Sequence, residues 1–225
     1  HLPQLARQLA TIDQMACGRL CINIISSDIP GEALDSAPRY QRTREWMQVL
    51  RQLLNGEAID FHGEFVDLDL APPRLRTVAG RCPPFYFGGL SPAAREVAAQ
   101  ASDVFLMWPD TLAATAATIE DMRARAAAHG RTLRYGFRTH VIVRETESEA
   151  RAASAALVSK LDPETGEAIR QRSLDTASAG VGAQVALREG ADDDGYAEAN
   201  LWTGIGRARS GAGAAIVGDP DQVRA

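Results

Sequence analysis

The chain has 225 residues, of which 45% are hydrophobic and 24% are charged, a balance typical of globular proteins. A net charge of -5 and a pI near 5.4 argue against nucleic acid as a partner, because a phosphate backbone requires a basic surface. The sequence contains no apolar run as long as the roughly 18 residues of a membrane span. Three scattered cysteines fit a reducing compartment, so we predict a cytoplasmic protein that binds no membrane.

Strand and helix patterns alternate along most of the chain. We predict helices where hydrophobic residues recur every three to four positions, at residues 2–15, 42–54, 92–101, 111–129 and 147–160. A hairpin is predicted at 58–70, and four core strands at 20–25, 85–87, 103–108 and 135–144. This alternation indicates an α/β fold with a parallel sheet, either an open doubly wound sheet or part of a (β/α)8 barrel.

The C-terminal third has a different character. Residues 162–200 lose periodicity, and residues 204–213 are rich in glycine and arginine. This glycine-rich segment is either a disordered linker or a lid whose arginine clamps an anion. Because the chain begins and ends in helical patterns, we expect it to be part of a longer protein, with residues 1–225 forming one partial domain that carries an insertion and lid at about 160–213.

The predicted strand at 135–144 carries two polar residues, Arg138 and His140. Side chains alternate along a strand, so these two are expected on one face, with Phe137, Thr139 and Val141 on the other, apolar face. One interpretation is a strand that lines a polar site, and the other is an edge strand that shows both residues to water.

Other candidate residues lie at the carboxyl ends of the predicted strands, where sites form in both barrels and open sheets. Asn23 and Ser26 close the first strand. A two-glycine turn with Gly89 and Ser91 opens a helix and suits a phosphate, although an ordinary strand-to-helix turn explains it as well. Trp108 closes the third strand, either as core or as the wall of a pocket. The histidines fall in no metal-binding frame, so we predict no metal site.

In this order, these segments resemble the luciferase-like flavin monooxygenases, in particular the two-component alkanesulfonate monooxygenase branch. The resemblance covers nearly the whole chain except roughly residues 160–195, and its most specific part is residues 138–146. The other matching segments are residues 8–13, 18–19, 23–26, 39–40, 84–91, 108, 126–131 and 200–219.

The resemblance implies a TIM-like (β/α)8 barrel, of which about four core strands are present. It implies an FMNH2- and O2-dependent enzyme of sulfur metabolism that cleaves the C–S bond of an alkanesulfonate to an aldehyde and sulfite. The reduced FMN would come from a separate NAD(P)H-dependent FMN reductase, and the enzyme is expected to be a homo-oligomer. Leu90 stands where many relatives have serine in the phosphate turn, which leaves fewer phosphate donors.

The resemblance also implies roles for individual residues. His140, Arg138 and Arg209 match the catalytic pair and the arginine of the lid. The cofactor would be held by Asn23 and Ser26 near the flavin ring and by Tyr40, Gly89 and Ser91 near the phosphate, whereas Trp108 would meet the substrate. Two other functions stay open: an F420-dependent oxidoreductase on the same barrel, and a non-catalytic flavin-binding protein.

Overall fold

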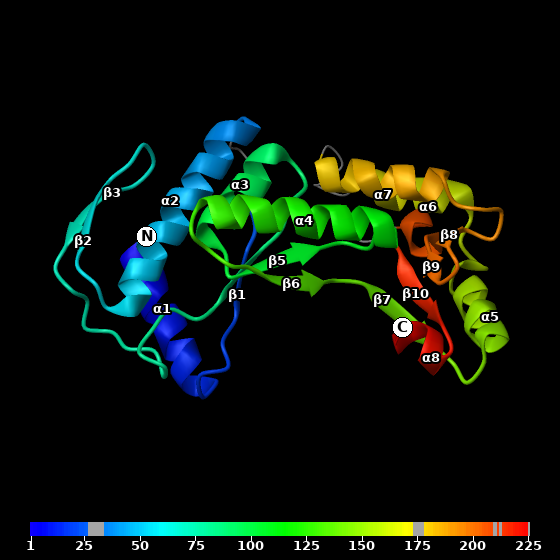
Figure 1. Ribbon diagram of the computed structural model, residues 1–225, viewed down its shortest axis with the longest axis horizontal. Helices are drawn as coiled ribbons and strands as arrows, with labels where there is room; N and C mark the ends of the chain where they lie inside the picture. Colours follow the sequence, from blue (N-terminus) through cyan, green and yellow to red (C-terminus); the bar gives the residue numbers. More distant parts are fainter. Residues whose placement is uncertain (27–33, 173–177, 209–210, 212, 225) are drawn as a thin grey trace. The chain divides into compact units, whose positions relative to one another are not determined.

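The computed structural model describes residues 1–26, 34–172, 178–208, 211 and 213–224 (Figure 1). Its contacts divide the chain into two compact units. The N-terminal unit comprises residues 1–88, 92–105 and 122–134, and the C-terminal unit comprises residues 89–91, 106–121 and 135–225. The expected single domain with a lid at about 160–213 stays a prediction.

The N-terminal unit consists of short strands covered by helices. In chain order its elements are α1 (Leu2–Met15), β1 (Ile22–Ile24), α2 (Ser36–Asn55), β2 (Ile59–His62), β3 (Asp67–Leu70), β4 (Phe85–Phe87) and α3 (Pro92–Ala101). Three further elements contribute residues to both units: β5 (Val104–Met107), α4 (Leu112–Ala128) and β6 (Arg134–Phe137).

The first sheet has the strand order β1-β4-β5-β6, and β4 pairs in parallel with both β1 and β5. Phe85 and Phe87 point to one face of β4 and are fully buried, whereas Tyr86 between them points to the other face and is half-buried. Helix α2 packs against α1 and α3 and buries Leu53 and Leu54. These apolar side chains form the core of the N-terminal unit.

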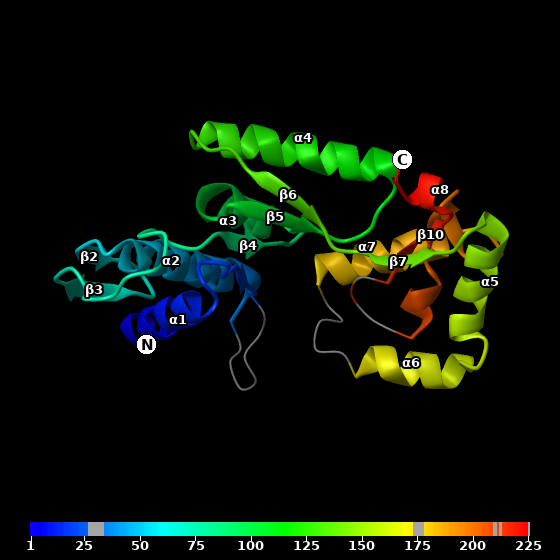
Figure 2. The ribbon, with the colours of Figure 1, turned by 90° about the horizontal axis from the view of Figure 1, so that it is seen from below.

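The C-terminal unit contains the second sheet. Its elements are β7 (His140–Val143), α5 (Glu147–Val158), α6 (Pro163–Gln171), α7 (Ala179–Glu189), β8 (Tyr196–Glu198), β9 (Leu201–Trp202), the 3-10 helix η1 (Gly204–Arg207), β10 (Ala215–Gly218) and α8 (Pro220–Arg224). The strand order is β7-β10-β9-β8, with β10 parallel to β7 and antiparallel to β9. Helix η1 contacts α5, α6 and α7, and it lies among them in Figure 2.

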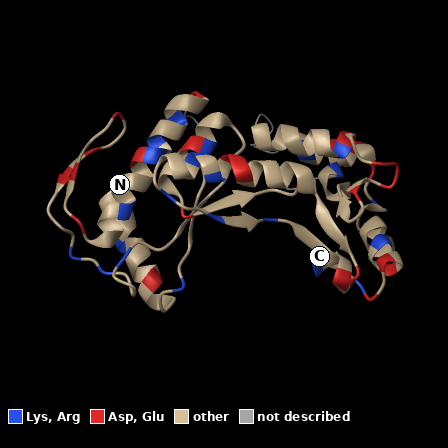
Figure 3. Ribbon diagram, viewed as in Figure 1, with Lys and Arg blue, Asp and Glu red and all other residues tan. Residues whose placement is uncertain are grey.

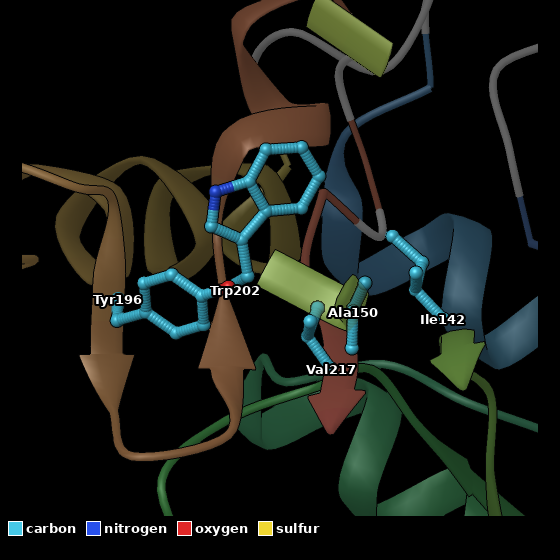
Figure 4. Close-up of a cluster of buried hydrophobic side chains, with 6 residues drawn as sticks. Ile142, Ala150, Tyr196, Trp202 and Val217 are labelled. Carbon is cyan, nitrogen blue, oxygen red and sulfur yellow. The ribbon is translucent and has the colours of Figure 1, made fainter. Parts of the chain in front are cut away.

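A small apolar core holds the second sheet together. Ile142 of β7, Val217 of β10 and Trp202 of β9 meet Ala150 of α5, and Tyr196 and Ala215 complete the cluster (Figure 4). Ala150 has a small side chain, which lets helix α5 pack against the sheet. Within the described ranges, no helix is long and apolar enough to cross a membrane.

The structure confirms the first three predicted core strands but corrects the fourth. The expected strand at 135–144 is two strands, β6 and β7, separated by Arg138 and Thr139. The break lies where the chain passes from one sheet to the other, because β6 belongs to the first sheet and β7 pairs with β10 in the second. Strand β10, parallel to β7, is an additional strand that the periodicity did not reveal.

The helices differ from expectation in two places. Helix α2 begins at Ser36, six residues before the predicted start at residue 42. Helices α6 and α7 occupy part of the region 162–200, which was predicted to lack regular structure. Both begin at a side chain that caps the first turn: Asp162 accepts from the Thr165 N–H, and Ser178 accepts from the Val181 N–H.

Candidate functional site

Two of the proposed cofactor residues are close together in the N-terminal unit. Ser26 follows β1, and its Oγ lies 2.9 Å from Oγ1 of Thr43 on α2. Tyr40 stands three residues before Thr43 on the same helix and therefore on the same side of it. Its ring packs edge-on against Phe87, with the ring centroids 6.4 Å apart. The sequence interpretation missed Thr43, although its spacing from Tyr40 was a usable signal.

Asn23 points away from this group. It is the central residue of β1 and pairs with Tyr86, whereas Ile24 pairs with Phe87. Because side chains alternate, Asn23 lies on the opposite strand face from Phe87 and hence from the Tyr40 ring. Asn23 is exposed, so its amide is accessible to a ligand. The structure thus brings Ser26 near Tyr40 but does not bring Asn23 near either of them.

The two-glycine turn follows β4 as expected. Gly89 and Ser91 are half-buried, and Ser91 directly precedes α3. This placement puts a hydroxyl beside the start of a ten-residue helix. In the N-terminal unit, Ser26, Thr43 and Tyr40 carry neutral hydroxyl groups, which are chemically suited to the oxygen atoms of a flavin ring or phosphate. These residues therefore fit the cofactor that the resemblance implies.

The proposed catalytic pair lies in the C-terminal unit. The backbone N–H of Arg138 donates to the carbonyl of Met107, 2.9 Å away, which places Arg138 beside the end of β5, and its side chain is exposed. His140 is half-buried and opens β7 opposite Ala215 of β10. Because the strand is broken between them, alternation does not force the two side chains onto one face.

The expected apolar face of this strand is also corrected. Val141 and Phe137 were predicted to be buried, but they are 53% and 41% exposed. Ile142 is buried instead, and alternation puts His140 on the same face as Ile142. The cause is the break at residues 138–139, which separates the alternation of β6 from that of β7.

Trp108 follows β5 and is half-buried. A Cβ built on Gly180 of α7 would lie 3.0 Å from its Cζ3 atom, and a Cβ built on Gly211 would lie 3.4 Å from its Cη2 atom. Gln184, one turn after Gly180, donates from Nε2 to the carbonyl of Pro109 at 2.6 Å and accepts from the Gly213 N–H at 3.1 Å. The sequence interpretation missed Gln184, and no periodic signal marked it.

Arg209, the predicted lid arginine, lies outside the described residues. Its neighbour Arg207 ends η1 and is exposed. Helix α7 also bonds to this region through Arg188, whose Nη1 donates to the carbonyl of Gly206 at 2.9 Å. The Gly206 N–H in turn donates to the carbonyl of Gly213 at 2.8 Å.

The buried cysteine takes no part in such chemistry. Burial raises the pKa of the Cys82 thiol to about 12, so the thiol stays protonated at neutral pH. A protonated, enclosed thiol is a poor nucleophile. Cys82 is therefore part of the core of the N-terminal unit.

Comparisons with known proteins agree with the fold. The family model described as luciferase-like monooxygenase matches residues 4–225. A protein of Novosphingobium aromaticivorans named sulfoquinovose monooxygenase is 62% identical, over 99% of this chain and 64% of its own length. A protein of the same name from Agrobacterium fabrum is 52% identical, over 97% of this chain and 57% of its own length. The chain thus spans about three fifths of the length of these relatives.

A solved structure of riboflavin lyase, with modified FMN and its substrate riboflavin, superposes with a TM-score of 0.73. It is 15% identical, and the match covers 99% of this chain and 59% of that one, so it supports the fold alone. The expected fold class is confirmed as an α/β fold with a parallel sheet that resembles part of a luciferase-like TIM barrel. The chain belongs to the luciferase-like monooxygenase family.

Proposed function

We propose that this protein is an FMNH2- and O2-dependent monooxygenase that cleaves the C–S bond of a sulfonated sugar and releases sulfite. The observation that carries the proposal is the 62% identity, over nearly the whole chain, to a protein named sulfoquinovose monooxygenase. A sulfonated sugar takes the place of the alkanesulfonate expected from the sequence. Both share the sulfonate and the C–S bond, so the reaction class is the same.

The overall reaction balances with one flavin and one O2. A sulfonate R-CH2-SO3⁻, O2 and FMNH2 give an aldehyde R-CHO, bisulfite, FMN and water. Reduced FMN supplies the two electrons that activate O2 when it is bound. The resemblance assigns the holding of its oxygen atoms to Ser26 and Tyr40 of the N-terminal unit and to Gly89 and Ser91 of the C-terminal unit, and it assigns Asn23 to the flavin ring.

The proposed catalytic residues match the charges of this reaction. The Arg138 guanidinium is always charged and binds a sulfonate through two parallel N–H groups, which a lysine cannot do. His140 can accept or donate a proton at a ring nitrogen as the C–S bond breaks. Trp108 offers a flat apolar wall against which a sugar ring can stack. Arg209 adds a second cation from the glycine-rich segment.

Sulfite release is the test. The purified protein is supplied with FMN, NAD(P)H and a flavin reductase, and is given sulfoquinovose or a series of alkanesulfonates in air. We expect stoichiometric sulfite from sulfoquinovose, a higher kcat/KM for it than for the alkanesulfonates, and no product without O2.

Two other results would contradict the proposal. Equal or better turnover of alkanesulfonates would instead support the alkanesulfonate substrate that was expected from the sequence. Substrate reduction or oxidation with F420 in the absence of O2 would instead identify a deazaflavin-dependent enzyme on the same barrel.

A further inference from the structure

Helix α7 lies against the indole ring of Trp108, the proposed substrate residue. Three carbons of the indole, Cζ3, Cε3 and Cη2, would lie 3.0, 3.3 and 3.7 Å from a Cβ at position 180. Glycine is therefore the residue that leaves room for the ring here. The same six-membered ring also lies near Gly211, where a Cβ would be 3.4 to 4.0 Å from Cη2, Cζ2 and Cζ3.

One turn along α7, Gln184 bonds to backbone groups in the two segments that carry Trp108 and Gly211. Its amide N–H donates to Pro109, the residue after Trp108, and its amide oxygen accepts from Gly213, two residues after Gly211. Residues four apart share a helix face, so Gly180 and Gln184 act on Trp108 together. Only a side-chain amide offers a donor and an acceptor at this reach, because a carboxylate would set an oxygen against the Pro109 carbonyl.

We propose that Gly180 and Gln184 are positioning residues that set the orientation of the Trp108 indole and thereby the substrate selectivity of the site. The selectivity part rests on the proposed function, whereas the positioning part does not. Gly180 determines how close the ring comes to α7. Gln184 links Pro109, the residue after Trp108, to Gly213 of the glycine-rich segment, and so limits how the backbone next to the ring can move.

The chain offers a matched pair of substitutions to test this. Gly180→Ala and Gly182→Ala both replace a glycine of α7 and both raise helix propensity, by up to about 1 kcal/mol. A Cβ at position 182 would meet nothing within 4 Å. Any difference between the two variants therefore reports the contact with Trp108 and not the stability of the helix.

The first readout is the indole N–H resonance of Trp108 in a proton–nitrogen NMR spectrum, assigned by its loss in Trp108→Phe. We expect Gly180→Ala to shift this resonance and Gly182→Ala to leave it in place. With sulfoquinovose, Gly180→Ala should raise KM roughly three- to tenfold and change kcat less, since uniform binding is lost. A Trp108 resonance that stays unshifted in Gly180→Ala, or that shifts equally in both variants, would overturn the proposal.

Gln184 is tested separately, in case Gly180→Ala does not fold. Gln184→Glu keeps an acceptor for Gly213 but loses the donor to Pro109, and Gln184→Leu loses both. We expect both variants to shift the Trp108 resonance, and Gln184→Leu alone to speed amide exchange at Gly213. Gln171→Leu is the control, because its amide donates to Glu167 of its own helix.

Unchanged Trp108 and Gly213 signals in both Gln184 variants would contradict the proposal. The NMR readouts need no turnover, so they keep their meaning even when the wild-type protein releases no sulfite. In that event the proposed function fails while the positioning role of α7 is still decided by the resonance shifts.

Discussion

At the scale of single residues, the proposed chemistry uses a cation, Arg138, and an imidazole, His140, that lie two residues apart in the sequence. Arg138 is held next to β5 by its own N–H, and His140 is held at the start of β7 by the pairing with Ala215. The strand break between them frees the Arg138 side chain from the alternation of the sheet. Arg138 is exposed, whereas His140 is half-buried.

We expect His140→Ala to lower kcat/KM for sulfite release by about 100-fold or more, the usual effect of losing a group that transfers a proton. The free energy of unfolding should change by less than about 1 kcal/mol, because His140 is only half-buried. Sulfite assays and urea denaturation measure the two quantities. His62→Ala, on the exposed hairpin, is the control for removing a histidine. A large loss of stability with unchanged turnover of the folded fraction would show that His140 is structural.

At the scale of elements, a buried carboxylate attaches the β2–β3 hairpin to α2. The outward face of the hairpin carries aspartates, visible as red segments in Figure 3, and offers no apolar surface of its own there. Glu45 of α2 is 1% exposed and accepts from three consecutive backbone N–H groups of the loop, at Glu64, Phe65 and Val66, over 2.8 to 3.1 Å. The loop between β2 and β3 is therefore held by α2.

Glu45→Gln should destabilise the protein by about 1–3 kcal/mol, because the new NH2 group faces N–H donors and leaves them unsatisfied. Glu64→Gln removes a neighbouring exposed carboxylate and should change little. Urea denaturation at pH 7 measures both. A variant as stable as the wild type would mean that the loop finds other partners, and the proposed attachment would be wrong.

The same contact predicts a pH dependence. Burial by itself would raise the pKa of Glu45, but the hydrogen bonds from Phe65, Gln41, Glu64 and Val66 outweigh it, so the pKa is lowered from 4.5. A lowered pKa in the folded state stabilises the protein above the unfolded pKa, and this stabilisation is lost as the pH falls through the folded pKa. The stability difference between wild type and Glu45→Gln should therefore shrink below about pH 4.5.

At the scale of the whole molecule, each compact unit has its own core. The N-terminal unit buries Phe85, Phe87 and Phe105, and the C-terminal unit buries Ile142, Trp202 and Val217. Ala150 of helix α5 packs in the core of the C-terminal unit. The helix starts with a capping box, in which the Thr146 side chain accepts from the Glu149 N–H and the Glu149 side chain accepts from the Thr146 N–H. Stability in this unit thus depends on a well-formed start of α5.

Thr146→Ala should cost about 1 kcal/mol, the usual effect of losing an N-cap hydroxyl. Ser148→Ala, in the first turn of the same helix, is the matched control. Native-state hydrogen exchange should show faster exchange at Ile142 and Val217, whose core contains Ala150. Equal effects of Thr146→Ala and Ser148→Ala would contradict the role of the cap.

The sequence alone determined what is encoded over short distances. Short apolar runs indicated β1, β4 and β5, and a recurrence of apolar residues every three to four positions indicated the helices between them. The resemblance to the luciferase-like family was also visible in the sequence, because it depends on which residues occur in short segments and on the order of those segments. Helices α6 and α7 escaped because they are short and bury few residues, even though Asp162 and Ser178 marked their starts.

Only the tertiary structure decided the features that depend on partners distant in the chain. The break at residues 138–139 exists because β6 and β7 belong to different sheets, and no property of those two residues announces it. The bonds from Gln184 to Pro109 and Gly213 span 75 and 29 residues. Local periodicity reports which residues avoid water, whereas the choice among distant partners is made by packing, and it is this choice that sets the surroundings of Trp108 and His140.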